Sequence, residues 1–385
     1  MKDVKAVSTL KFRLSAGVTG QQDGIGDYVH LARYSISNDP YHTYNMGGSQ
    51  YVDLITPQAY DPTVRWETTV TYNVGVDYGF FNDRLSGSID AYIRDTKDLL
   101  NSVQVPMGSN FGNKLMTNIG SIRNKGLEFS INAVPVQRPD LSVQLGFNGT
   151  FQNTIFTKLN PTEDENYYIE TGNISKGTGG YLCRQMVGYA PYTYYTYRQK
   201  YYPDGNPVQN EFVDLDGDGT ITENDRYMTG KSVAPKFYYG LNMKVTWRNW
   251  DFGLNGHGAA GTWVFNDFAS ANSTASLDLN SGALPNQARL VNKTGFTAPN
   301  SGQQWYSDYF LENASFFRLD DINLGYTFRG IGRWETDIRL ALGMQNVFIL
   351  TGYSGMDPEV ISENGIDNTV WPRPRTWSFR VNVNF

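Results

Sequence analysis

The last ten residues, 376–385, read TWSFRVNVNF and alternate between apolar and polar side chains without a break. The apolar set is Trp377, Phe379, Val381, Val383 and Phe385, and the polar set is Thr376, Ser378, Arg380, Asn382 and Asn384. Successive side chains of a β-strand point to opposite faces, so this period of two predicts a strand with one apolar and one polar face.

The same alternation recurs upstream, for example over residues 68–80 and 237–247. It predicts ten strands, at about residues 9–19, 64–80, 85–98, 119–134, 141–157, 235–247, 250–260, 315–328, 336–350 and 375–385. No long segment carries the period of an amphipathic helix. The sequence therefore predicts an all-β fold.

The connections between these predicted strands alternate strictly between short and long. The short ones lie near residues 81–84, 135–140, 248–249 and 329–335, and the long ones near 20–63, 99–118, 158–234, 259–313 and 351–374. A transmembrane barrel has short turns on one side of the membrane and long external loops on the other, whereas a soluble sandwich has no reason to alternate. We therefore expect a transmembrane antiparallel β-barrel. The alternative is a soluble, secreted β-rich module for glycan binding or adhesion, which would purify from an aqueous extract.

In a membrane barrel, one face of each strand meets lipid and the other lines the lumen. The alternation assigns Leu241, Leu340, Leu342 and Val381 to the lipid face and Arg339 to the lumen. We therefore expect contact with outer-membrane lipid along the first set.

Composition agrees with a membrane barrel and excludes several other classes of protein. The 385 residues are 40% hydrophobic, 14% aromatic and 18% charged, and no segment approaches the ~20 consecutive apolar residues of a spanning helix. The net charge of -6, with scattered Lys and Arg, argues against nucleic-acid binding. Asp3, Lys5 and Lys11 stand where a secretion signal would need an apolar core, so we expect such a signal upstream of Met1.

Several segments, in order along the whole chain, resemble the SusC/RagA-like branch of TonB-dependent outer-membrane receptors. They include LKFRLSAGVTGQQDGIGDY, NIGSIRNKGLEFSINA, FVDLDGDGTITENDR, FLENASFFRLDDINLGYTF and LALGMQNVFILTGYSGMDPEV. The resemblance implies a plugged 22-stranded barrel, of which residues 1–385 would form roughly the last ten strands as one C-terminal barrel part without the plug domain. The segment at about 158–234 would be a long external loop.

The resemblance also implies a function and partners. A receptor of this kind imports an oligosaccharide or peptide across the cell outer membrane together with a SusD-like surface lipoprotein. The TonB complex and the plug would be reached only through an N-terminal part that this chain lacks. The terminal strand, with Trp377, Phe379, Val381, Val383 and Phe385, is similar to the family's signal for the barrel-assembly machinery.

The segment DLDGDGTITEND, residues 214–225, has the spacing of a calcium-binding loop. Asp214, Asp216 and Asp218 occupy positions 1, 3 and 5, Thr220 position 7, Thr222 position 9 and Asp225 position 12. Hard oxygen ligands at this spacing suit Ca²⁺, although an Asp replaces the usual bidentate Glu at the last position. The sequence predicts a weak or partial structural calcium site. An acidic Asx-turn loop without metal is the alternative, and no other cofactor is expected.

The same long connection contains the aromatic segment PYTYYTYRQKYY, residues 191–202. Its rings, at Tyr192, Tyr194, Tyr195 and Tyr197, can pack within the loop, contact a partner or stack on a substrate. We favour packing or partner contact over direct substrate contact.

The residues do not indicate an enzyme. The segment TGKS at 229–232 has Asp225 where a phosphate-binding loop needs its first glycine. Asp320 and Asp321 are neighbours on a predicted strand, so we expect them to point to opposite faces rather than to share an acid–base site. His30, His42 and His257 have no zinc-binding spacing and are expected to be polar residues of loops or of the lumen.

Overall fold

A computed structural model describes residues 6–384 except 37–42, 46, 48–50, 107, 109, 113, 160–165, 178–179, 276–287, 298, 334, 360 and 369–370. Ten long strands form one sheet, in which every neighbouring pair is antiparallel. They are β1 (Val7–Gln21), β6 (Glu67–Phe80), β7 (Leu85–Lys97), β10 (Ser121–Arg138), β11 (Leu141–Lys158), β18 (Phe237–Trp247), β19 (Trp250–Ala260), β22 (Phe316–Ile331), β23 (Thr336–Thr351) and β25 (Thr376–Asn384). The predicted all-β class and the ten predicted strands are confirmed.

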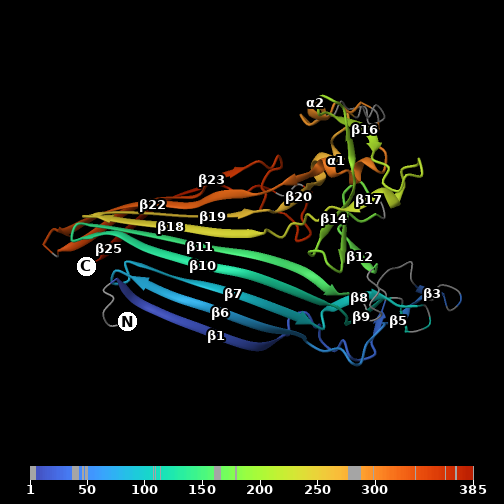
Figure 1. The fold of residues 1–385 in the computed structure, drawn as a ribbon, viewed down its shortest axis with the longest axis horizontal. Coiled ribbons are helices and arrows are strands. Elements are labelled where there is room, and N and C mark those ends of the chain that lie inside the picture. The colour runs from blue at the N-terminus through green and yellow to red at the C-terminus, as the bar shows by residue number, and fades with distance from the viewer. Residues whose placement is uncertain are drawn as a thin grey trace.

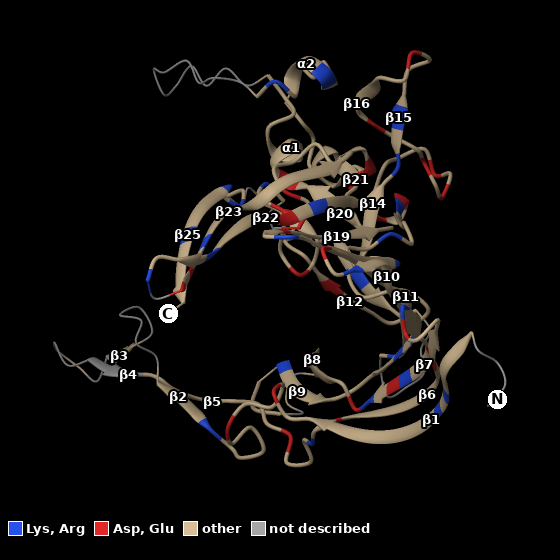
Figure 2. Ribbon diagram, turned by 90° about the vertical axis from the view of Figure 1, so that its left-hand side faces the viewer, with Lys and Arg blue, Asp and Glu red and all other residues tan. Residues whose placement is uncertain are grey.

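The strands follow one another across the sheet in chain order, and the sheet is open. Figure 1 shows the short turns at one end of the sheet and the long connections at the other, and Figure 2 shows that the sheet curves into part of a cylinder. Among the described residues, β1 pairs only with β6 and β25 only with β23, so the two outermost strands do not meet. This is the geometry of a partial barrel.

The long connections carry short strands and helices that alternation did not predict. They are β2 (Tyr34–Ile36), β3 (Thr43–Asn45), β4 (Tyr51–Asp53), β5 (Ile55–Pro57), β8 (Leu100–Gln104), β9 (Lys114–Asn118), β12 (Tyr168–Thr171), β13 (Cys183–Met186), β14 (Thr193–Tyr197), β15 (Gln199–Tyr201), β16 (Pro207–Phe212), β17 (Arg226–Met228), β20 (Trp263–Asn266), β21 (Leu311–Asn313) and β24 (Ile366–Asp367), with η1 (Glu223–Asp225), α1 (Asp267–Ala271), α2 (Val291–Thr294), η3 (Gln304–Tyr306) and η4 (Asp308–Phe310). Among the described helices, none has the length and apolarity needed to cross a bilayer.

The main cluster of buried apolar residues lies in these connections and not on the sheet. It joins residues of three long connections, among them Tyr194, Phe265 and Ile366, each at most 2% exposed. The strand β20 pairs with β21 on one side and with β24 on the other. Because β24 belongs to the last long connection, this pairing brings that connection into the same folded unit. We call this unit the loop domain. It stands at the long-connection end of the sheet (Figure 1).

Candidate functional site

One face of the sheet, which we call the polar face, carries ion pairs between neighbouring strands. Arg13 on β1 lies 2.8 Å from Asp77 on β6 and 2.7 Å from Asp90 on β7. At the other side of the sheet, Nε and Nη2 of Arg339 donate to the two oxygens of the Asp251 carboxylate, at 2.9 and 2.5 Å. These pairs keep charged groups on one side of the wall, where hydrogen-bond partners satisfy them.

The opposite, apolar face consists of large side chains that nothing in the described chain covers. Phe12 is 74% exposed, Leu14 85% and Leu342 58%. Leu340 lies on the same face, since it pairs with Val381 across β23 and β25. An uncovered apolar face of this extent on a folded sheet requires an apolar neighbour, either another protein or lipid.

Aromatic rings run across this apolar face in a row that alternates with glycine. Phe129, Gly149, Tyr239, Gly258 and Phe317 face one another across five strands. A Cβ atom added at Gly258 would lie 2.4 Å from the Tyr239 ring, so the glycine lets the ring lie flat on the strand. The row gives the wall a smooth aromatic surface, as cross-strand packing of rings over glycine does in designed barrels.

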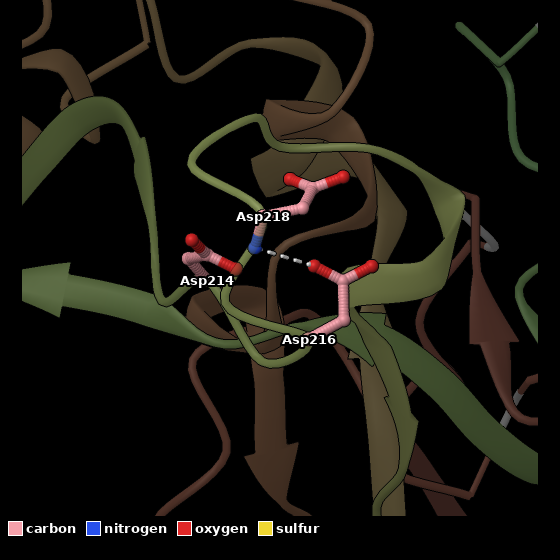
Figure 3. A group of neighbouring side chains, drawn as sticks. All are labelled: Asp214, Asp216 and Asp218. Carbon is pink, nitrogen blue, oxygen red and sulfur yellow. Dashed lines mark hydrogen bonds between the residues drawn. The ribbon is translucent and has the colours of Figure 1, made fainter.

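The acidic loop predicted to bind calcium lies in the loop domain (Figure 3). Each of Asp214, Asp216 and Asp218 offers one carboxylate oxygen within 4.8 Å of the other two. Asp214 accepts hydrogen bonds from the backbone amides of Gly217 and Gly219, at 2.6 and 2.9 Å, which wraps the chain around its carboxylate. The structure thus brings three of the predicted ligands together.

The structure does not bring Asp225 into this group. Its side chain is fully buried, and its two oxygens accept backbone amides from Leu215 and Thr222, both at 2.7 Å. These amides hold the pKa of the Asp225 carboxyl below its usual value. Thr222 caps η1, and the Thr220 amide donates to Asp218 at 2.7 Å. Asp225 therefore stabilises the conformation of the loop through these backbone hydrogen bonds and is not placed with the other three carboxylates.

Four tyrosines of the aromatic segment, Tyr192, Tyr194, Tyr195 and Tyr197, lie in the interior of the loop domain, whereas Tyr201 and Tyr202 are exposed. Tyr194 is 0% exposed, Tyr195 8% and Tyr197 4%, and the partly buried Tyr192 packs against the same cluster. Burial raises the pKa of Tyr197 to about 12, so its hydroxyl stays neutral. In this structure three of the four rings have too little exposed surface to meet a substrate.

Arginines alternate with these rings in a stack. The Arg184 guanidinium lies 3.9 Å from the Tyr168 ring centre and 3.5 Å from that of Tyr195, and the Arg226 guanidinium lies 4.3 Å from the Tyr195 ring centre. Burial lowers the pKa of Arg226, which shows how costly its charge is at this place. Cation–π contacts offset part of that cost. The aromatic segment is explained by this packing.

The predicted assembly strand forms β25 at one edge of the sheet. Trp377, Phe379, Val381 and Val383 point to the apolar face, where they pair with Met344, Leu342, Leu340 and Ile338 of β23. Phe385, the last residue of that motif, lies outside the described residues. Whether this strand acts as an assembly signal stays a prediction.

A buried ion network on the polar face was missed by the sequence reasoning. Arg318 on β22 is 2% exposed and donates to Glu359 at 2.9 Å, to Asp357 at 2.6 Å and to Asn346 at 2.5 Å. Arg373 adds a second cation, 3.1 Å from Glu359. The network joins the wall to the last long connection. Arg318 and Glu359 are 41 residues apart in the chain, so no local motif signals their contact.

The prediction that Asp320 and Asp321 point to opposite faces is wrong. The strand β22 has a bulge between Leu319 and Asp321, which places one extra residue opposite Asn255 and Gly256 of β19. Asp320 reaches His257 at 2.6 Å, and Asp321 reaches Asn255 at 2.7 Å. Since residues 255 and 257 share one face of β19, both carboxylates lie on the polar face. His257 is a polar-face residue, in agreement with the sequence.

Comparisons with known proteins agree with this architecture. Residues 10–347 match the family model described as TonB dependent receptor-like, beta-barrel. The whole chain is 39% identical to the TonB-dependent receptor SusC of Bacteroides thetaiotaomicron and 29% identical to the TonB-dependent receptor P3 of Formosa agariphila. It covers 38% and 40% of those two proteins, so the chain spans about two fifths of the length of these curated relatives.

A solved structure shows the same fold. The whole chain superposes on 42% of a chain in the structure of the RagAB peptide transporter, with a TM-score of 0.80 at 23% sequence identity. The open ten-stranded sheet, its two unlike faces and the match over most of its length lead to one conclusion. The chain belongs to the β-barrel family of TonB-dependent receptors.

Proposed function

We propose that this chain is the C-terminal barrel part of an outer-membrane receptor that imports nutrients with energy from the TonB complex. The observation that carries the proposal is the open sheet with one apolar and one polar face in a member of this receptor family. The apolar face suits lipid, and the polar face suits a lumen through which a polar substrate passes. Family membership gives no support to the soluble module considered as an alternative.

The relatives support a proposal for the substrate class. RagAB is described as a peptide transporter, and SusC is a TonB-dependent receptor with 39% identity. We infer import of an oligosaccharide or a peptide, together with a SusD-like surface lipoprotein. The TonB complex and a plug would act through the part of the receptor that precedes these residues. No residue of this chain is assigned a catalytic role.

A growth experiment tests the proposed function. The gene for the complete receptor is deleted, and the strain is grown on single oligosaccharides or peptides as the limiting nutrient. We expect growth to fail on one group of related substrates and to return with the complete gene only in a strain with intact TonB. Unchanged growth on every substrate, or rescue without TonB, would contradict the proposal.

The two faces of the wall predict opposite responses to a change of charge. Leu340→Arg places a charge on the apolar face and should lower the free energy of unfolding of the complete receptor by ~2–4 kcal/mol. Arg339→Leu, on the adjacent polar-face position, removes the ion pair with Asp251 in a wet lumen and should cost far less. Urea titration of both variants in lipid bilayers measures the difference. Equal costs would show that the faces are assigned wrongly.

We also propose that Asp214, Asp216 and Asp218 bind a calcium ion in the loop domain. Three carboxylate oxygens within 4.8 Å repel one another strongly unless a cation or water separates them. A backbone amide of the loop donates to each of the three carboxylates and so holds its side chain in place. With Asp225 engaged by the backbone, the site has fewer protein ligands than a complete calcium loop, and we expect weak binding.

Proteolysis tests the calcium site. Removing calcium from the complete receptor with a chelator should increase cleavage within residues 158–234, because the acidic loop then loses the ion that holds it. Asp216→Ala should give the same cleavage pattern at saturating calcium. Asp204→Ala, an exposed aspartate in a neighbouring turn, serves as the matched control. If neither chelation nor Asp216→Ala changes the pattern, the loop is an Asx-turn structure without metal.

A further inference from the structure

His257 on β19 joins two carboxylates that come from different parts of the chain. Its Nδ1 lies 2.6 Å from the Asp320 carboxylate on β22, and its Nε2 lies 3.0 Å from the Glu359 carboxylate. Glu359 belongs to the connection that follows β23, and we call the described residues 352–359 and 361–365 of this connection the strap. We call His257, Asp320 and Glu359 the latch.

The latch geometry favours the protonated form of the imidazole. A neutral histidine has one N–H and one lone pair, so it can donate to only one of two ionised carboxylates. Both ring nitrogens of His257 lie within hydrogen-bond distance of a carboxylate oxygen. Both contacts are attractive only when His257 is an imidazolium that donates from each nitrogen.

Charge balance leads to the same state. The ion network contains the carboxylates of Asp320, Asp357 and Glu359 and the cations Arg318, Arg373 and, when protonated, His257. The three negative charges are matched only if His257 carries its proton. Loss of that proton leaves one carboxylate in excess and turns one hydrogen bond into a contact between lone pairs.

No other group named near His257 takes over the hydrogen bond that the imidazole loses on deprotonation. From β22 these are Arg318 and Asp321, from β23 Asn346, from the strap Asp357 and Glu363, and from β18 the Tyr238 hydroxyl. Asp321 accepts from Asn255, and Arg318 is fully engaged with Glu359, Asp357 and Asn346. His257 is 36% exposed at its side chain, so protons exchange with water at the latch while Arg318 behind it is buried.

The strap connects the latch to the loop domain. At its far end, the Gly365 carbonyl lies 2.9 Å from the buried Tyr194 hydroxyl, and the next residue begins β24. At its near end, Tyr353 packs against Val264 and Ala314. The latch therefore holds the middle of a segment whose two ends are fixed in the loop domain.

We propose that His257, Asp320 and Glu359 form a proton-dependent latch that ties the strap to the barrel wall at acidic to neutral pH and releases it at alkaline pH. Imidazole titrates in the range of about pH 5–8, so the external medium of a bacterium can set the state of the latch. Proton binding and strap binding favour each other by the same factor. In the released state the Arg318–Asp357 pair still holds one point of the strap, so release means a gain of motion in the exposed residues beside that point, Met356 among them.

Electron paramagnetic resonance of the complete receptor tests the latch. Met356, beside Asp357 in the strap, is 62% exposed and can be replaced by cysteine and labelled with a nitroxide. Cys183, the only native cysteine of these 385 residues, is fully buried and should not label. Cysteines elsewhere in the receptor are removed. We expect the label to become more mobile from pH 5 to pH 9 along a single-proton curve, with a change of roughly 5- to 150-fold in the ratio of free to latched strap.

Two variants and one control separate the latch from other effects of pH. In His257→Gln the label should be mobile at every pH. In His257→Lys, which places a permanent cation at this position, the label should be immobile at every pH. His30→Gln, which changes an exposed histidine in the connection after β1, should leave the transition unchanged. Heat-modifiable migration checks that each variant is folded. A transition that survives in His257→Gln, or its absence in the unmodified receptor, overturns the proposal. The readout does not require uptake, so it stands apart from the test of the import function.

Discussion

Residues 1–385 expressed alone behind a secretion signal should give no TonB-dependent uptake. In the part of the chain that the structure describes, β1 and β25 are the outer strands of the sheet, and each presents an edge of backbone N–H and C=O groups to no further strand. In lipid each such group costs several kcal/mol, so an open sheet cannot persist there. Closure of the ten strands on themselves would give a much narrower barrel, with too little room for the charged side chains of the polar face.

The measurement is uptake in a strain that lacks the native receptor. The complete receptor, expressed from the same promoter, is the control and should restore uptake and give a heat-modifiable band from the outer membrane. The 385-residue chain should aggregate or associate through its edges and give neither. Uptake by this chain would show that the rest of the barrel and the plug are dispensable. That result would contradict the interpretation of the ten-stranded sheet as one part of a larger barrel.

Arg318→Met should lower the free energy of unfolding of the complete receptor by about 3–5 kcal/mol. The guanidinium is 2% exposed and its partner Asp357 5%, so the pair is screened little by water. Methionine keeps most of the side-chain volume but removes the charge. Asp357 and Glu359 then remain near the wall without their main cation, and an uncompensated buried charge is costly.

Arg380→Met on β25 is the matched control for this variant. Arg380 is exposed at the edge of the sheet, and the same substitution there should change stability by well under 1 kcal/mol. Urea unfolding of both variants in bilayers, followed by tryptophan fluorescence, gives the two values. A small effect of Arg318→Met, similar to that of the control, would show that the buried network does not stabilise the barrel.

The ten strands were predictable because their environment differs on the two faces. Lipid on one side and a polar lumen on the other require apolar and polar side chains to alternate along each strand. Phe379, Val381 and Val383 show this alternation in the sequence. The structure places these three side chains on one face with Leu340 and Leu342. The predicted turn near 135–140 was too long, since β10 continues to Arg138.

Reasoning from local pattern failed where one extra residue or a distant partner decides the outcome. The bulge at Asp320 reverses the face expected from strict alternation, and the sequence has no proline or glycine there to signal it. Asp225 has the right spacing for a metal ligand, but two backbone amides occupy its oxygens. The short strands of the loop domain have only two to six residues, too few to show a period.

The sequence by itself determined the strands, their two faces, the alternation of turns and loops, and the acidic loop, because each depends on neighbours a few residues apart. Only the tertiary structure decided where the loop domain has its core and how the strap meets the wall. Tyr194 and Gly365 are 171 residues apart, and His257 and Glu359 are 102 residues apart. Such contacts form because the curved sheet brings the long connections to one end, where side chains from distant segments must exclude water and neutralise charge together.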